Sequence, residues 1–165
     1  MKILHTADIH YSRENQERAL WALETVAETA EQEKVDLIVI AGDLFDRPVN
    51  NTESSGFPHL LRVMQRLMDV APVVAVTGTP THDVLGSYEA FVELRANHNF
   101  TLLYPGNACF LDNFNVQYQK NEHSKLLIMG CPEPSKQWFL ADKQLGKEAG
   151  NEAIKNGMRQ LFLGE

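Results

Sequence analysis

The chain has 165 residues, of which 44% are hydrophobic and 22% charged, and this predicts a globular protein with one domain over residues 1–165. Its formal net charge of −7 argues against a free-standing nucleic-acid binder, which usually carries a basic stripe. The negative net charge does not exclude a nucleic-acid enzyme, because the carboxylates of a metal site contribute to that charge and a partner can supply the basic surface. The two cysteines, Cys109 and Cys131, form no CxxC pair and argue against a zinc knuckle or a disulfide framework.

The N-terminus leads directly into strand-like sequence. It has neither the long apolar run nor the small-residue cleavage site of a signal peptide. No window of the sequence reaches the unbroken apolar length of a membrane span. We therefore expect a cytoplasmic protein.

The first hundred residues alternate between strand and helix patterns. The apolar run at 38–41 is typical of a strand buried on both faces, and it leads into Gly42 and two carboxylates, Asp43 and Asp46. Apolar residues at helical spacing predict helices between the strands. The predicted strands cover residues 2–7, 35–41 and 73–76, and the helices cover 14–33, the segment after a loop at 47–57, and 87–96 with Ser87 as its cap.

This alternation predicts parallel strands, whose following loops meet at one edge of the sheet near residues 10, 46 and 83. Beyond residue 100 the pattern changes to short strands, which predicts a second, mixed or antiparallel sheet. The expected fold is therefore an α/β sandwich of two mixed sheets flanked by helices. The strand candidates here are 101–103, 108–111, 114–119 and 126–129, with hairpin turns at 112–113 and 120–124 and a terminal helix from Gln144.

The shared edge gathers polar groups suited to a metal site. Asp8 and His10 leave their strand on the same side and can present an oxygen and a nitrogen to one cation. Asp43 can bridge two metal ions, the arrangement in which two ions about 3.5–4 Å apart clamp a phosphoryl group. His82 can protonate a leaving oxygen or hold a phosphate, and Asp46 can orient a ligand or its loop. Each motif alone could be an ordinary polar turn. The occurrence of all three, each at the end of a predicted strand, favours a metal site. Asp83 follows His82 directly and belongs to the same predicted edge.

These residues carry a resemblance to a known family. Asp8-x-His10, Gly42-Asp43-x-x-Asp46 and His82-Asp83 resemble the first three motifs of the calcineurin-like metallophosphoesterases. Within that superfamily the opening at residues 1–10, the Gly-Asp-Leu-Phe-Asp-Arg stretch and the later Gly-Cys-Pro-Glu-Pro at 130–134 are similar to the SbcD-type DNA repair nucleases.

The resemblance implies a four-layer α/β/β/α sandwich with two divalent metal ions, most often Mn²⁺. It implies exonuclease and endonuclease activity on double-stranded DNA ends and hairpins. It also implies a coiled-coil ATPase of the SbcC type as partner, with a homodimer as a further expectation. The metal ligands that it implies among the residues present are Asp8, His10, Asp43 and, in the place of the family's asparagine, Thr81.

The sequence departs from the family pattern in two places. The third motif, usually Gly-Asn-His-Asp, is Gly-Thr-Pro-Thr-His-Asp at 78–83, and a threonine hydroxyl is a poorer ligand than an amide oxygen. No histidine follows Gly130, so the family's last two motifs, which complete both metal spheres, are missing. We therefore expect a naturally short relative or the N-terminal part of a nuclease domain, weakly active or inactive by itself.

Two other functions stay open at this point. The chain could be a phosphodiesterase or phosphatase for a small substrate, which its acidic charge favours slightly. It could also be a non-catalytic assembly module with a vestigial site, which Thr81 and the missing histidines favour.

Overall fold

The computed structural model describes residues 1–47, 55–83, 85–104, 106–131 and 147–163. The chain divides into two compact units, residues 1–131 and 132–165. The second unit contains α5, Lys147–Leu163, which agrees with the predicted terminal helix, although Gln144 lies outside the described residues. The expectation of one domain over residues 1–165 stays a prediction.

The first unit is built on a parallel sheet of four strands in the order β1-β2-β3-β4. Its central strands are almost entirely apolar and buried, because helices cover one face and a second sheet covers the other. The strands are β1 at Ile3–Thr6, β2 at Leu37–Ala41, β3 at Val73–Val76 and β4 at Phe100–Leu103.

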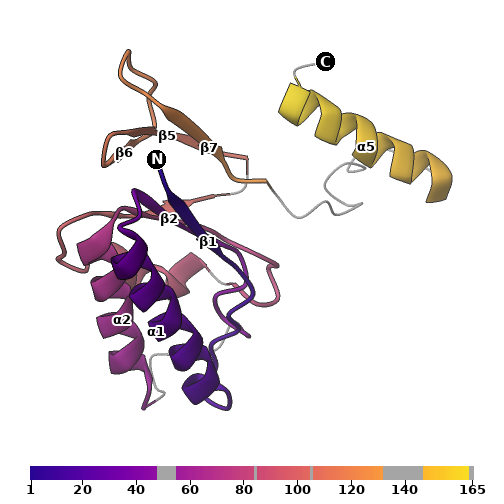
Figure 1. Ribbon diagram of the computed structural model, residues 1–165. Coiled ribbons are helices and arrows are strands. Elements are labelled where there is room, and N and C mark those ends of the chain that lie inside the picture. Colours follow the sequence, from indigo (N-terminus) through magenta and orange to yellow (C-terminus); the bar gives the residue numbers. More distant parts are fainter. Residues whose placement is uncertain (48–54, 84, 105, 132–146, 164–165) are drawn as a thin grey trace. The chain divides into compact units, whose positions relative to one another are not determined.

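Two helices supply the crossovers between the first three strands. They are α1, Gln16–Glu33, and α2, Phe57–Val70, and Figure 1 shows them side by side against one face of the sheet. The apolar stripe of α2, which includes Leu60, Met64 and Leu67, is fully buried in the larger of two apolar cores. Since both crossovers return the chain to a parallel strand, the predicted strand–helix alternation is confirmed.

The fourth parallel strand corrects one expectation. Residues 101–103 were expected in the second sheet, but β4 pairs with β3 in parallel register, with Val74 opposite Thr101. The crossover that permits this is shorter than the predicted helix at 87–96. It consists of a 3-10 turn at Leu85–Ser87 and the helix α3 at Glu89–Val92, whose N-cap is Tyr88 rather than Ser87.

The second sheet has three antiparallel strands in the order β6-β5-β7, so the expected second sheet is confirmed. Its apolar face packs on the first sheet through a smaller core that includes Leu37, Val74 and Leu111. The hairpin turn at 112–113 joins β5 to β6 as expected. Its strands are β5 at Ala108–Asp112, β6 at Asn115–Gln117 and β7 at Leu126–Met129.

The turn predicted at 120–124 is not a hairpin. The chain leaves β6 on one edge of the sheet and crosses to β7 on the other, and both strands pair with β5. This order places Leu126 and Ile128 beside Leu111 on the buried face, which explains the pairing. Among the described residues, no helix has the length and apolar character needed to cross a membrane.

Candidate metal centre

The loops that follow β1 and β2 are joined by main-chain hydrogen bonds. The His10 amide donates to the Asp43 carbonyl at 3.0 Å, and the Tyr11 amide donates to the Leu44 carbonyl at 2.7 Å. In the opposite direction the Asp46 amide donates to the Tyr11 carbonyl at 3.0 Å. The two motifs therefore lie side by side at the carboxyl edge of the sheet, as the strand order predicts.

Three residues of these loops have left-handed backbone conformations. The φ angles are 55° at Asp8, 54° at His10 and 50° at Asp43. Such angles cost a residue with a Cβ atom about 1–2 kcal/mol, and the hydrogen bonds between the loops help to hold them. Strained positions of this kind concentrate at functional sites, where they aim side chains that a relaxed loop would turn elsewhere.

Two glycines let the loops after β2 and β3 approach each other. Gly42 has a φ of 87°, and a Cβ atom placed on it would lie 2.9 Å from the Cα of Gly78. A Cβ atom on Gly78 would collide with the main-chain nitrogen and the carboxylate of Asp43. Only glycine at both positions allows the third loop to reach Asp43.

The loops bring His10, Asp43 and His82 together. Each offers a ligand atom, and these atoms all lie within 4.8 Å of one another. Nδ1 of His82 is 3.1 Å from Oδ2 of Asp43, and the two imidazole rings have centroids 4.9 Å apart. This spacing is close to that of ligands around one ion, whose bonds are each about 2.0–2.3 Å long.

Thr79 holds the Asp43 carboxylate in place. Its amide and its hydroxyl both donate to Oδ1 of Asp43, each at 2.7 Å, and the hydroxyl lies 3.1 Å from Nδ1 of His82. Burial acts to raise the pKa of Asp43, but the Thr79 hydroxyl, the Thr79 amide and His82 together lower that pKa below its usual value. Asp43 is therefore a carboxylate at neutral pH, which is the form that binds a cation.

Sequence reasoning missed Thr79 and singled out Thr81. Thr81 is exposed, and the threonine that contacts Asp43 is the one that directly follows Gly78. The available signal was Gly78 itself, because a glycine at the end of a strand often marks a close approach of two chain segments.

Asp83 links the loop after β2 to the loop after β3 through hydrogen bonds of its buried carboxylate. It is only 5% exposed; Oδ1 accepts from the Phe45 amide at 3.0 Å, and Oδ2 accepts from the Gly78 amide at 2.7 Å. The hydroxyl of buried Tyr88 donates to the same Oδ2 at 2.7 Å, and burial together with Asp83 raises the pKa of Tyr88. Asp83 is thus buried and holds the two loops in position; it is not part of the cluster of His10, Asp43 and His82.

The other predicted residues surround the cluster. Oδ1 of Asp8 is 3.9 Å from Nε2 of His10, and its side chain is 74% exposed. Oδ1 of Asp46 is 3.6 Å from Nδ1 of His10. The assignment of Asp8 and Thr81 as metal ligands, and of His82 and Asp46 as catalytic residues, stays a prediction.

The residues present fit a divalent cation. Nδ1 of His10 is buried without a hydrogen-bond partner among the described residues, which is unusual for a polar atom. Two imidazoles and a carboxylate form a mixed nitrogen and oxygen donor set, which suits manganese, iron and zinc. His10 and Asp43 would hold such an ion, with His82 within reach of the same position.

Comparison with known families agrees with this geometry. The model of the calcineurin-like phosphoesterases matches residues 1–142, which include both sheets and the whole cluster. The chain belongs to this family.

Proposed function

We propose that this chain is a metal-dependent DNA nuclease of the SbcD type, which hydrolyses phosphodiester bonds as part of an SbcCD-type repair complex. The observation that carries the proposal is the cluster of His10, Asp43 and His82 at the carboxyl edge of the parallel sheet, in a chain of the calcineurin-like phosphoesterase family. The similarity of residues 1–10 and 42–47 to the sequences of SbcD-type nucleases supports the choice of DNA as substrate.

The protein's own residues have distinct parts in this proposal. Asp43, fixed by Thr79, and His10 would hold a divalent cation, most often Mn²⁺, and Asp8 with Thr81 or water would contribute to a second ion. Bound divalent ions supply an activated water and stabilise the charge on the phosphoryl group. His82 is held at Nδ1 by Asp43 and Thr79, so its Nε2 is left to protonate the leaving oxygen. Asp46 orients His10.

The acidic chain needs a partner to hold DNA. With a net charge of −7 it attracts phosphates weakly by itself. A coiled-coil ATPase of the SbcC type would supply the positive surface, and a homodimer remains a further expectation of the proposal.

The test is a nuclease assay with the enzyme in excess over a labelled DNA duplex and a hairpin, in Mn²⁺. At most weak cleavage is expected with the unaltered chain alone, and it should fall to the metal-free background in Asp43→Asn, because removal of a central metal ligand abolishes the site. Asp69→Asn, on α2, is the matched control and should leave cleavage unchanged, since Oδ1 of Asp69 accepts a hydrogen bond from the Asn97 amide and none from the cluster among the described residues.

Two results would overturn the proposal. Turnover of an aryl phosphodiester without cleavage of DNA would assign the site to a small-substrate phosphodiesterase. Absence of cleavage together with no Asp43-dependent binding of Mn²⁺ in calorimetry would indicate an assembly module with a vestigial site.

A further inference from the structure

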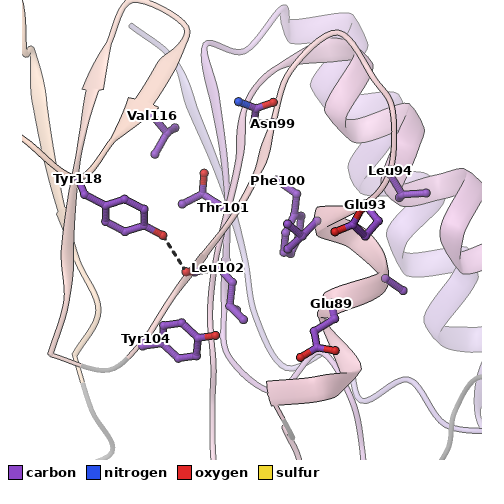
Figure 2. Close-up of a pocket in the computed structure, with 12 residues that line it drawn as sticks. Glu89, Glu93, Leu94, Asn99, Phe100, Thr101, Leu102, Tyr104, Val116 and Tyr118 are labelled. Atoms are coloured by element: carbon purple, nitrogen blue, oxygen red, sulfur yellow. Dashed lines mark hydrogen bonds between the residues drawn. The ribbon is translucent and has the colours of Figure 1, made fainter.

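A cavity of about 850 Å³ lies beside β4, and none of its lining residues belongs to the candidate metal centre. Figure 2 shows it between β4, the helix α3 and the strand β6. It therefore offers a second surface whose use does not depend on the proposed nuclease function.

One wall of the cavity is the open edge of β4. In the part of the chain that the structure describes, β4 is the last strand of its sheet and pairs only with β3. The Asn99 carbonyl accepts from the Val73 amide, so Asn99 and Thr101 turn their main-chain groups toward β3. Because alternate residues of a strand point to opposite sides, Phe100 and Leu102 turn theirs toward the cavity.

The hydrogen bond of Tyr118 confirms this direction. Its hydroxyl donates to the Leu102 carbonyl at 3.3 Å, which Figure 2 shows as a dashed line across the cavity. The side chain of Tyr118 is 60% exposed, so it can swing aside when a main-chain amide takes its place. The free main-chain edge of β4 can therefore pair with another strand, once the long hydrogen bond from Tyr118 to the Leu102 carbonyl is broken.

The two remaining walls differ in chemistry. On the side of β6, Val116 and Tyr118 present apolar and aromatic surface. On the side of α3, Glu89 and Glu93 are exposed, lie one helical turn apart and make no ion pair with any described residue. An entering strand would turn alternate side chains toward these two walls.

We propose that this edge binds an extended segment of a partner protein that adds a strand to β4 and alternates apolar with basic residues. Its main-chain amides and carbonyls pair with Phe100 and Leu102. Its apolar side chains pack on Val116 and Tyr118, and its lysines or arginines face Glu89 and Glu93. Adding a strand to a sheet edge is a common mode of peptide recognition.

The charge of the surface selects this occupant over two others. A second copy of this chain would bring its own Glu89 and Glu93 against the same pair, and like charges facing each other are unfavourable. Nucleic acid is excluded from the acidic wall for the same reason. A basic peptide is the occupant whose charge complements the surface.

The test uses the whole chain and a fluorescent seven-residue peptide of alternating valine and lysine, with binding followed by anisotropy. A peptide of the same charge with proline in place of the valines keeps only the lysine amides as donors, and the proline rings disfavour pairing within a sheet, so it should bind at least about tenfold more weakly. The double change Glu89→Gln with Glu93→Gln should weaken binding about fivefold, and added salt should reduce that difference. The matched pair Glu28→Gln with Glu122→Gln removes the same charge from exposed positions elsewhere and should change binding less than about twofold.

Amide hydrogen exchange reads the pairing itself. The Phe100 and Leu102 amides should exchange more slowly with the peptide bound, while the Thr101 amide, already turned toward β3, should change little. Failure of the peptide to bind, equal binding of the proline peptide, or an equal effect of the matched pair would overturn the proposal. So would protection of both amides before peptide is added, which would assign the edge to the chain's own residues, or a peptide-sensitive dimer, which would assign it to a second copy.

Discussion

At the scale of single residues, the candidate metal centre depends on small groups as much as on its ligands. Gly78 has no chemistry of its own, yet a side chain there would occupy the place of the Asp43 carboxylate. Asp83 and Tyr88 touch no ligand atom of the cluster, yet their hydrogen bonds hold two of the three loops together. The geometry of the site therefore depends on residues that are not themselves candidate metal ligands.

Gly78→Ala tests the close approach. The added methyl group would push the Asp43 loop away, so we expect a loss of about 1–3 kcal/mol in unfolding free energy and a much weaker Mn²⁺ affinity in calorimetry. Gly86→Ala is the matched control, because a Cβ atom at Gly86 has no neighbour within 4 Å. Equal Mn²⁺ affinity in both variants would show that the loops can separate without harm.

Tyr88→Phe tests the support beneath the centre. Loss of its hydroxyl removes one of the two hydrogen bonds to Oδ2 of Asp83. The expected loss in unfolding free energy is about 1–2 kcal/mol, measured by urea denaturation. Tyr104→Phe, at a position 44% exposed, should cost less than about 0.5 kcal/mol. A Tyr88→Phe variant as stable as the unaltered chain would contradict this role for the hydroxyl.

At the scale of elements, an ion network links α1 to α2. Arg66 on α2 donates to Glu24 at 2.6 Å and to Glu31 at 2.6 and 2.7 Å, and Nε2 of His59 lies 2.8 Å from Glu24. The hydrogen bond with His59, and then Arg66, lowers the pKa of Glu24 against the opposing effect of burial. The hydrogen bonds from Arg66 likewise lower the pKa of Glu31.

The pH dependence of Arg66→Gln follows from these directions. Both carboxyl groups have a pKa below the ordinary value of 4.5 in the folded protein, so folding favours their charged forms. The stability they contribute is fully present above pH 4.5 and is lost as the pH falls through the folded pKa values. Because the three side chains are between 31% and 43% exposed, Arg66→Gln should cost less than about 1 kcal/mol at pH 7 and less still at pH 3.

Urea denaturation at the two pH values measures the effect. Arg62→Gln is the control, since Arg62 is an exposed cation on the same helix. A cost for Arg66→Gln that does not change with pH would mean that packing of its side chain, not pairing with Glu24 and Glu31, stabilises the helix pair.

At the scale of the whole molecule, a metal that binds only the folded chain must stabilise it. Mn²⁺ at 100 times its dissociation constant should add about 2.7 kcal/mol to the unfolding free energy of the unit that contains the cluster. Asp43→Asn should abolish the gain, and Asp69→Asn should retain it. Thermal denaturation with and without Mn²⁺ measures this, and an equal gain in both variants would place the bound metal elsewhere.

Much of this arrangement was accessible from the sequence for a physical reason. Carboxyl ends of parallel strands share an edge, so Asp43 and His82 could be placed together from strand order alone. Strand membership was harder, since the four-residue run of β4 suits either sheet and only the short crossover through α3 decides it. Contacts within a loop were out of reach, because spacing does not reveal which threonine of 78–83 turns toward Asp43.

The close approach of the loops at Gly42 and Gly78 also bears on the order of folding. The contacts between the loops after β2 and β3 join residues 36 to 39 positions apart and need the crossover through α2 to close, while the contacts of His10 with the Asp43 loop need the crossover through α1. We therefore expect the centre to be among the last features to form during folding, so that metal binding would report that β1, β2 and β3 have paired. Refolding followed by Mn²⁺ capture would time that final step.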